Sequence, residues 1–425
     1  MNTWPVGTVV VTFAVAVFVT ILAMNLMGGE KQIKQHLEHH YDVTDAQFLR
    51  SMGVLLGPAL VGGNQVTTLL NGDQIFPSML QAIRGAKHTI TFETYIYWSG
   101  AIGKEFADAL SDRARNGVRV HVMLDWVGSQ KLDEAALEEM RAAGVEIKKY
   151  HPPRWYTLNK LNNRTHRKLL VVDGSIGFTG GVGIADNWSG HAQDADHWRD
   201  THYRIEGPAV AQMQAAFTDN WTKVTGRILH TSGYFPPLRE AGKQYAQVFQ
   251  SSSEGGAESM HLMYLLSIAA AARSIHLSMA YFVPDEVTID TLRAALERGV
   301  KVQILLPGPI RDADAVGEAS RAGWGDLLER GAEIYEYQPT MFHCKVLTVD
   351  GLWSSVGSTN FDNRSFRLND EANLNVYDQE FAQRQIADFK EDLKRSRRVT
   401  FEEWKARPWT EKLRQQALAL FNAQW

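Results

Sequence analysis

Two stretches of this 425-residue chain, about 180 residues apart, repeat the same pattern of residues. The first contains an apolar, β-branched run at 86–97 (AKHTITFETYIY), and the second contains a similar run at 272–283 (ARSIHLSMAYFV). In both, an amphipathic helix pattern follows, ends at a glycine (Gly117 or Gly299) and leads into a second apolar run. A repeat of this length indicates that one structural unit is present twice, which constrains the fold more than any other feature of the sequence.

The order of elements within each repeat indicates an α/β architecture. Apolar strand runs alternate with helix patterns of about 10–15 residues, which is typical of βαβ units around a parallel or mixed sheet. We therefore predict two pseudo-symmetric α/β/α lobes in one chain, at residues 61–230 and 235–400. A duplication can be purely structural, so the function has to be sought in the polar residues that the repeat carries.

Each lobe carries one copy of the pattern His-x-Lys-x4-Asp. The six residues are His166, Lys168 and Asp173 in the first lobe and His343, Lys345 and Asp350 in the second. Because side chains alternate along a strand, the imidazole and the ammonium of each H-x-K lie on one face. Two such groups on an apolar strand are costly unless an anion lies between them. The repeated pattern therefore predicts an anion site, and we place all six residues in the catalytic set.

The motif continues into a predicted β-hairpin. Each aspartate precedes a glycine, and Asp-Gly is a strong hairpin signal, so the aspartates are also explained as turn formers. The returning strand brings Ser358 and Asn360 back beside His343, and it brings Gly180 and Gly181 to the equivalent place in the first lobe. Small residues and an amide permit close approach to phosphate oxygens, so we predict that these four residues support phosphate binding.

Two lobes that meet face to face would gather two histidines and two lysines around one point. The ammonium groups would neutralise the non-bridging oxygens of a phosphodiester, while one histidine acts as nucleophile and the other as general acid. A carboxylate on the far nitrogen of each imidazole would fix its tautomer, and the candidates are Asp200 and Glu371. This set of groups needs no metal ion and no cofactor, and we predict neither.

Composition and missing motifs argue against several other classes of protein. Lys+Arg 44 against Asp+Glu 48 gives a formal net charge of −4, so no overall field attracts nucleic acid, and no nucleic-acid partner is expected. The single cysteine, Cys344, excludes an internal disulfide framework and a CxxC zinc site. The sequence has no GxxxxGK(S/T), HExxH or GxSxG motif, so P-loop, zinc-protease and nucleophile-elbow chemistry lack support.

The N-terminal region predicts attachment to a membrane bilayer. Residues 6–27 form an uncharged apolar run, which as a helix would span roughly 33 Å, the thickness of a bilayer core. We predict a transmembrane anchor there, rather than a cleaved signal peptide or a buried core helix, followed by a linker at 28–60. Lys31 and Lys34 after the run favour a single-pass protein whose catalytic body lies on the cytoplasmic side.

The C-terminal segment 401–425 mixes aromatic and aliphatic residues with basic ones, and we predict an amphipathic helix there. Trp404, Trp409 and Leu413 stand among Lys405 and Lys412. Such a pattern is typical of a helix that lies in the membrane interface, and equally of a helix that packs on the protein body. The sequence leaves both interpretations open.

The paired motifs resemble those of the phospholipase D superfamily, whose signature is two H-x-K-x4-D motifs, each followed by a GG or GS step and an Asn. The flanking sequences GGVGIADNW, WRDTHYRIEGPAV and GSTNFDNRSFRLNDEANLNV look most like the bacterial cardiolipin synthase branch, and the resemblance covers about residues 60–400. It implies two phospholipase D-like lobes, a site at the lobe interface and a phosphohistidine intermediate formed without metal. One position departs from the pattern, because Gly183 stands where the family has an Asn, so a fully symmetric phosphate cradle is not expected.

The resemblance further implies phosphatidyl transfer between two phosphatidylglycerol molecules at a bacterial inner membrane. His166 would attack phosphorus, His343 would protonate the departing glycerol, and a hydroxyl of the second phosphatidylglycerol would then complete cardiolipin. Three alternatives remain: hydrolysis to phosphatidic acid by the same site, a membrane-tethered nuclease that uses Arg154, Arg164 and Arg167 near the first motif, and an inactive membrane scaffold. The sequence predicts no oligomeric state.

Overall fold

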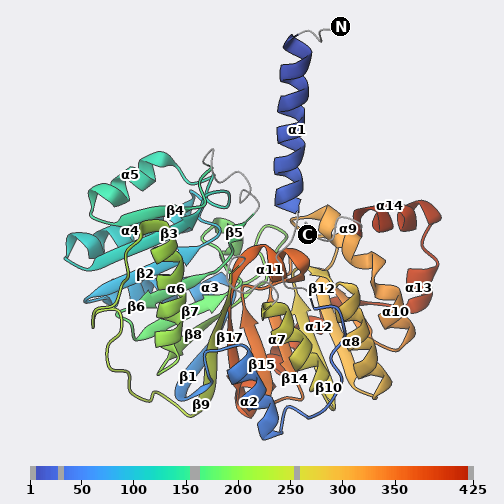
Figure 1. Cartoon of the computed structure of the whole chain (residues 1–425). Coiled ribbons are helices and arrows are strands. Elements are labelled where there is room, and N and C mark those ends of the chain that lie inside the picture. The colour runs from blue at the N-terminus through green and yellow to red at the C-terminus, as the bar shows by residue number, and fades with distance from the viewer. Residues whose placement is uncertain (1–5, 27–32, 154–162, 253–258, 420–425) are drawn as a thin grey trace.

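The structure, a computed structural model, describes residues 6–26, 33–153, 163–252 and 259–419. Figure 1 shows two α/β halves side by side, the first in blue and green and the second in yellow and red. The first half contains β1 (Val61–Leu70), α3 (Asn71–Gly85), β2 (Thr89–Thr94), α4 (Ala101–Arg115), β3 (Arg119–Asp125), α5 (Glu134–Ala142), β4 (Glu146–Tyr150), β5 (Arg164–Thr165), β6 (Leu169–Val172), β7 (Ile176–Gly180), the 3-10 turn η2 (Asp186–Trp188), β8 (Thr201–Glu206) and α6 (Val210–Thr225).

The second half repeats this order of elements with a few additions. It contains β9 (Gln244–Ser251), α7 (Ser259–Ala269), β10 (Ser274–Met279), β11 (Phe282–Val283), α8 (Glu286–Glu297), β12 (Lys301–Pro307), α9 (Asp314–Ala322), α10 (Trp324–Glu329), β13 (Glu333–Tyr337), β14 (Lys345–Val349), β15 (Trp353–Gly357), β16 (Phe361–Asp362), α11 (Asn363–Arg367), β17 (Asn369–Tyr377), α12 (Gln379–Leu393) and β18 (Ser396–Val399). Outside the two halves lie α1 (Val6–Leu26), α2 (Ala46–Leu55), α13 (Phe401–Lys405) and α14 (Trp409–Ala419).

One sheet runs through both halves and has internal symmetry. From one edge the order is β4-β3-β2-β6-β7-β8-β1, and from the other, after the extra β18, it is β13-β12-β10-β14-β15-β17-β9. In each half three strands are parallel (β2, β3, β4 or β10, β12, β13), and a hairpin then pairs antiparallel with the first of them. The antiparallel pair β1–β9 joins the halves. This arrangement confirms the predicted pair of similar α/β halves.

The inner strands β2, β6, β14 and β15 are buried on both faces, which explains their near-continuous apolar runs. In β2, Ile90 and Phe92 pack with α3 and α4, while Thr91 on the opposite face bonds to Gln214 of α6. A further core cluster contains Tyr203 and Val210 of the first half together with Val248, Phe342 and Phe381 of the second. Because one apolar core crosses the boundary, the halves are held in a fixed relation, as a shared site requires.

The segment predicted as a linker at 28–60 is partly built into the second half. Asp45 caps the N-terminus of α2, and its carboxylate accepts a hydrogen bond from the backbone N–H of Gln47 at 2.7 Å. Phe48 and Met52 of α2 are fully buried, and Phe48 meets Trp353 edge-on with ring centroids 5.0 Å apart. The linker prediction is therefore wrong for this part of the segment, because its apolar face completes a core.

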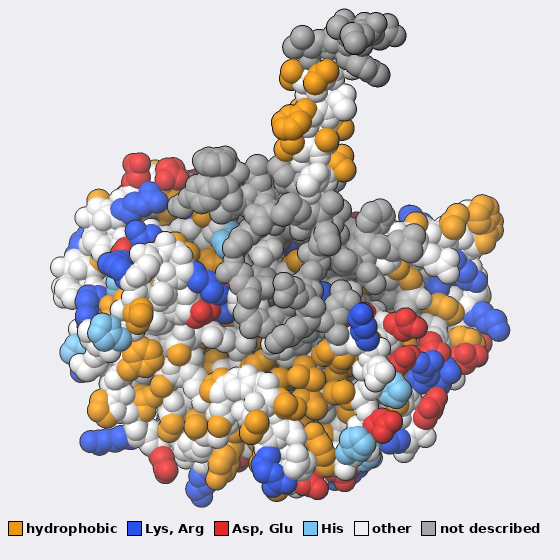
Figure 2. Space-filling view, viewed as in Figure 1, with side chains coloured by type: hydrophobic (Ala, Val, Ile, Leu, Met, Phe, Trp, Pro, Cys, Tyr) orange, Lys and Arg blue, Asp and Glu red, His pale blue; other side chains and the backbone are white. Residues whose placement is uncertain are grey.

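The predicted anchor region is occupied by α1, which stands clear of the body in Figure 1. Its side chains Val9, Val10, Val11, Phe13 and Phe18 are exposed. Figure 2 shows hydrophobic side chains, in orange, along this projecting helix. In the part of the chain that the structure describes, no helix reaches the length and apolarity needed to cross a membrane.

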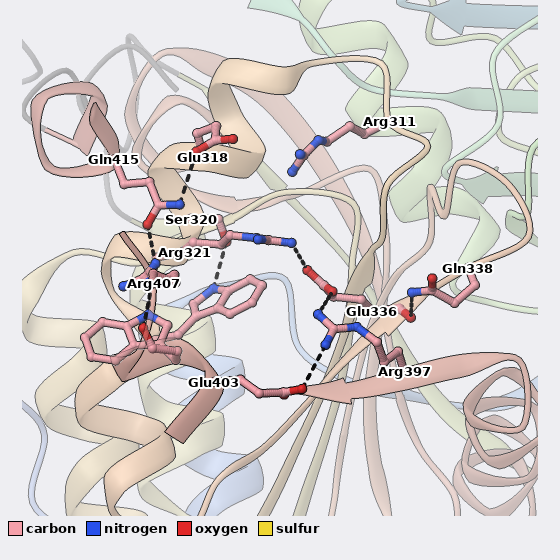
Figure 3. Close-up of polar contacts among 12 residues, drawn as sticks. Arg311, Glu318, Ser320, Arg321, Glu336, Gln338, Arg397, Glu403, Arg407 and Gln415 are labelled. Atoms are coloured by element: carbon pink, nitrogen blue, oxygen red, sulfur yellow. Dashed lines mark hydrogen bonds and ion pairs between the residues drawn. The ribbon is translucent and has the colours of Figure 1, made fainter. Parts of the chain in front are cut away.

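The C-terminal segment packs on the second half by polar contacts, as Figure 3 shows. Trp404 Nε1 donates to the carbonyl oxygen of Arg321 at 2.7 Å, and Gln415 Nε2 donates to Glu318 Oε2 at 3.1 Å. Gln415 is buried, whereas Trp409 and Leu413 remain exposed. One face of α14 contacts α9, as the interpretation of a helix packed on the protein body expects, and the exposed Trp409 and Leu413 leave the membrane-interface interpretation a prediction.

Candidate functional site

The two H-x-K segments lie where the halves meet, and each is hydrogen-bonded to the opposite half. The backbone N–H of His166 donates to the carbonyl oxygen of Asp370 at 2.8 Å, and that of His343 donates to the carbonyl oxygen of Arg199 at 2.8 Å. The short strand β5, just before His166, pairs in parallel with β17 of the second half. These crossings bring both histidines to one pocket.

Each imidazole has its carboxylate partner in the other half. Nδ1 of His166 lies 2.9 Å from Oε1 and 3.0 Å from Oε2 of Glu371, and Nδ1 of His343 lies 2.8 Å from Oδ2 of Asp200. The structure therefore brings together both predicted carboxylates and both histidines, with the pairing exchanged between halves. Since a carboxylate accepts a hydrogen bond, Nδ1 carries the proton in the neutral ring and Nε2 is left as the reactive nitrogen.

Different donors hold the two carboxylates. Ser358 Oγ donates to Glu371 Oε2 at 2.6 Å, so Ser358 orients a carboxylate and does not line the pocket. Trp188 Nε1 donates to Asp200 Oδ2 at 2.9 Å, and the backbone N–H of Thr201 donates to Asp200 Oδ1 at 2.8 Å. The halves thus reach the same geometry with unlike residues.

The two lysines are buried beside the histidines. Lys168 Nζ donates to the carbonyl oxygen of His166 at 2.9 Å, and Lys345 Nζ donates to that of His343 at 2.7 Å. Lys345 Nζ also lies 2.9 and 3.0 Å from the two ring nitrogens of His343. In each motif the ammonium lies beside the histidine, although residues 166–168 and 343–344 precede the strands β6 and β14, so the strand that the sequence predicted for each H-x-K begins later.

Burial controls the protonation of these groups. It lowers the pKa of His166 to about 4, against the opposing charge of Glu371 and together with those of Lys168 and Lys345. It lowers the pKa of Lys168 to about 7, and it also lowers the pKa values of His343 and Lys345. The pKa of Glu371 is lowered overall: burial raises it, but the charges of His166 and Lys168 and the hydrogen bonds from His166 and Ser358 lower it by more, so the carboxyl group stays ionised. A pocket holding neutral imidazoles and easily titrated ammoniums is suited to bind and attack a phosphate.

The pocket has a volume of about 210 Å³ and draws on both halves. Its lining includes His166, Lys168, His343 and Asn360. Asn360 is nearly buried, and within the described residues its Oδ1 has no hydrogen-bond partner. An unpartnered amide aimed into a pocket favours a role in ligand binding. In those residues, no group of three or more His, Cys, Asp or Glu is placed to hold a metal ion.

The glycines of the first hairpin make room for the site and do not line it. A Cβ on Gly181 would lie 2.2 Å from Oδ1 of Asp200, and one on Gly180 would lie 2.6 Å from the Cα of His202. At Gly183, the position equivalent to Asn360, a Cβ would lie 2.8 Å from the Cβ of Ile96. Neighbouring side chains therefore fill the place of the missing Asn.

The structure does not bring Asp173 and Asp350 to the pocket, which corrects their place in the predicted catalytic set. Both adopt the left-handed conformation, with φ of 50° and 53°, in the hairpin turns at the far ends of β6 and β14. Asp173 accepts hydrogen bonds from the backbone N–H groups of residues 87–89, and Asp350 from those of 272–274. Each therefore ties a hairpin to the start of the first parallel strand, and the turn-former interpretation is the correct one.

Several pocket residues come from segments that the motif does not mark. They are Tyr95, Ile96, Arg164, Trp188, Tyr281, Asp312, Val316, Asp362, Arg364, Ser365 and Asn369. Of the arginines suggested for a nuclease, Arg167 is fully buried and donates to the carbonyl oxygens of Ala216 and Ser251, and Arg154 lies outside the described residues. The sequence could indicate Arg164 as a pocket residue only by its place two positions before His166. No feature of the sequence indicates Arg364.

Known proteins are similar to this chain in sequence and in fold. A family model described as cardiolipin synthase, PLD-like domain, matches residues 79–221 and 264–393. The chain is 38% identical over 348 residues to a cardiolipin synthase of Geobacillus kaustophilus (strain HTA426), covering 81% of this chain and 69% of that one. It is 36% identical over 348 residues to the major cardiolipin synthase of Bacillus subtilis (strain 168), covering 81% and 72%.

Among solved structures, a phosphatidylserine synthase of Haemophilus influenzae Rd KW20 shares the fold, with a TM-score of 0.69 at 14% identity. The match covers 89% of this chain and 99% of that one, so it includes both halves. On the two domain matches and the extent of the sequence identity, the chain belongs to the cardiolipin synthase branch of the phospholipase D-like family.

Proposed function

We propose that this protein is a cardiolipin synthase that transfers a phosphatidyl group from one phosphatidylglycerol to another and releases glycerol. Its family supports this activity, since curated relatives named cardiolipin synthase match most of the chain. The single observation that carries the mechanism is that both histidines, one from each half, line one pocket with Lys168, and that each has its carboxylate partner in the other half.

In the first step, Nε2 of His166 attacks the phosphorus of the donor phosphatidylglycerol. The bound phosphate and the carboxylate of Asp200 raise the pKa of His343, so that His343 is protonated in this complex. The bond from phosphorus to the glycerol oxygen breaks, and the imidazolium of His343 gives its proton to that oxygen, so that glycerol leaves. Lys168 and Lys345 stabilise the charge on the non-bridging oxygens, and a bound phosphate raises the pKa of both ammoniums. Glu371 stabilises the positive charge that His166 gains as a phosphohistidine.

In the second step, a hydroxyl of another phosphatidylglycerol attacks the phosphohistidine. His343, now neutral, takes the hydroxyl proton, and the bond from His166 to phosphorus breaks, which restores both histidines. We assign the nucleophile to His166 because the two lysines lie differently. Lys345 Nζ lies against both ring nitrogens of His343 and so hinders attack by its Nε2. Lys168 Nζ donates to the carbonyl oxygen of His166, which leaves Nε2 of His166 free to attack. Two in-line displacements retain the configuration at phosphorus.

We further propose that the protein is attached to the bacterial inner membrane by its N-terminal apolar segment, with the catalytic body on the cytoplasmic side. The uncharged run at 6–27 and the exposed apolar side chains of α1 support this placement. The exposed Trp409 and Leu413 of α14 supply a second apolar contact of the interfacial kind. We expect the full chain to resist alkaline extraction from membranes and a variant without residues 1–32 to be extracted. Extraction of the full chain as well as the variant would contradict this attachment.

The activity is tested with the purified full chain in vesicles of labelled phosphatidylglycerol without divalent metal. We expect cardiolipin and free glycerol, with both absent for His166→Ala and His343→Ala. Phosphatidic acid as the sole lipid product would make the protein a hydrolase of the phospholipase D type. No lipid product at all would reject a lipid substrate and would turn attention to nucleic acid.

A further inference from the structure

A buried ion pair that the mechanism above does not use joins the two halves beside the second motif. Nε and Nη2 of Arg199 donate to Oδ1 and Oδ2 of Asp392 at 3.0 and 2.9 Å. This is the paired, planar geometry in which a guanidinium binds a carboxylate most strongly. Arg199 lies just before β8 in the first half, and Asp392 lies on α12 in the second. Arg199 is 5% exposed and Asp392 7%, and both lie outside the lining of the pocket.

The third nitrogen of the guanidinium holds the residue that orients His343. Nη1 of Arg199 donates to the backbone carbonyl oxygen of Asp200 at 2.7 Å. The carboxylate of Asp200 accepts from Nδ1 of His343 at 2.8 Å, and the carbonyl oxygen of Arg199 accepts from the backbone N–H of His343 at 2.8 Å. Residues 199 and 200 therefore hold the ring and the backbone of His343 together, and the guanidinium fixes the backbone at Asp200.

The helix α12 gives this ion pair a rigid support. It packs against β14 and β15, the hairpin that follows His343. Asp378 caps its N-terminus by accepting from the backbone N–H of Phe381 at 2.8 Å, and Phe381 and Phe389 are among its buried residues. Through Asp392, residues 199 and 200 are therefore held against the same helix that supports the hairpin of His343.

The corresponding place beside His166 carries a residue of the opposite charge. Asp370 precedes Glu371, and its backbone carbonyl oxygen accepts from the backbone N–H of His166 at 2.8 Å. The carboxylate of Asp370 accepts from the hydroxyl of Tyr150 at 2.6 Å. Both histidines are thus held by the residue that precedes their carboxylate, but through different side chains. A change at Arg199 should therefore leave His166 in place.

We propose that Arg199, held by Asp392, is a positioning residue that fixes Asp200 and so directs His343 towards the leaving oxygen. This role rests on the proposed function and deepens it, because His343 gives a proton to glycerol in the first step and takes one from the acceptor in the second. A misplacement of about 1 Å can cost roughly 100-fold in rate. A buried ion pair stabilises a fold little more than apolar residues of similar volume do, so its place beside His343 favours the positioning role.

The test removes both charges together from the full chain, because either change alone leaves an unpaired charge in the interior. The double variant Arg199→Met with Asp392→Leu loses the hydrogen bond to Asp200 and keeps apolar volume in its place. In phosphatidylglycerol vesicles we expect its kcat for cardiolipin formation, per folded molecule, to fall tenfold or more, with KM unchanged. With phosphatidyl-p-nitrophenol as donor, whose leaving group departs without a proton, the burst of nitrophenolate should stay within threefold of the wild type. Arg199→Lys, which keeps the charge and loses the paired geometry, should lose less of kcat and keep the burst.

Tyr203→Phe is the matched control, because it removes a different buried contact between β8 and α12. The hydroxyl of Tyr203 donates to Gln385 Oε1 at 2.9 Å, and its loss leaves the contacts of Asp200 and His343 in place. Its kcat and its burst should equal those of the wild type. An unchanged kcat in the double variant overturns the positioning role, and so does an equal loss of kcat and burst, which indicates general disruption of the site. If the wild type itself makes no cardiolipin, the proposed function fails, and the positioning role fails with it.

Discussion

Replacing Glu371 with glutamine removes one negative charge from the site and leaves the size of the side chain unchanged. Glu371 is fully buried and accepts from His166 Nδ1 at 2.9 Å, Ser358 Oγ at 2.6 Å and Asn369 Nδ2 at 3.3 Å. A hydrogen bond to a charged group contributes about 1.5–3 kcal/mol. At about 1.36 kcal/mol for each factor of ten, that loss alone lowers kcat by roughly 10- to 150-fold. The uncompensated charge on a phosphorylated His166 adds to it, so we expect at least about 100-fold.

The assay separates the two exchanged carboxylates. With phosphatidyl-p-nitrophenol as donor, the leaving group departs without a proton, so the first step no longer needs His343. Asp200→Asn should then recover most of the wild-type burst of nitrophenolate, whereas Glu371→Gln should not, because Glu371 serves the nucleophile His166. Glu93→Gln is the control for the loss of a buried carboxyl group, because Glu93 is as buried as Glu371 and burial raises its pKa to about 7. It should not reproduce the loss of the burst seen in Glu371→Gln.

Two results would contradict these roles of Glu371 and Asp200. A kcat for Glu371→Gln within threefold of the wild type would show that the hydrogen bond between Glu371 and His166 does not contribute to catalysis. Recovery of Glu371→Gln and not of Asp200→Asn with the activated donor would show that the roles of the two histidines are reversed.

Three further predictions concern other parts of the molecule. Asp350→Asn should lower the free energy of unfolding by about 1.5–3 kcal/mol through its backbone contacts, with kcat per folded molecule retained; a catalytic defect without a stability loss in thermal denaturation would contradict the turn role. Gly183→Asn should cost about 1–3 kcal/mol of stability because Ile96 must move, and pairing it with Ile96→Ala should return part of that cost. In a pH profile, kcat/KM should fall as the pH rises through about 7, because Lys168 loses its charge. It should also fall as the pH is lowered towards 4, because His166 gains a proton. A flat profile from pH 6 to 9 would contradict the role of Lys168.

The sequence predicts where the paired histidines and lysines lie because their positions follow local rules. The x between His and Lys places Lys168 beside His166 and Lys345 beside His343, and the Asp-Gly turn returns Asn360 to the same end of the hairpin. The duplication predicts two halves with one pattern of strands. These inferences need only neighbours along the chain or across one hairpin.

The rest depends on contacts between distant parts of the chain. The exchange of Asp200 and Glu371 between halves arises where the H-x-K segments bond to the opposite half, which strand periodicity within one half does not reveal. Arg364 enters the pocket from α11, outside both motifs. The burial of α2 likewise depends on a core that only the folded second half provides.

A covalent intermediate on His166 distinguishes the proposed two-step transfer from any mechanism without an enzyme-bound phosphate. Vesicles of phosphatidylglycerol carrying a labelled phosphate are mixed with the full chain, quenched in alkali to preserve phosphohistidine, digested and examined by mass spectrometry. We expect a phosphatidyl or phosphoryl adduct on His166 that forms in the wild type and disappears in His166→Ala. Cardiolipin formed with no labelled histidine, or with the label on His343 alone, would contradict it.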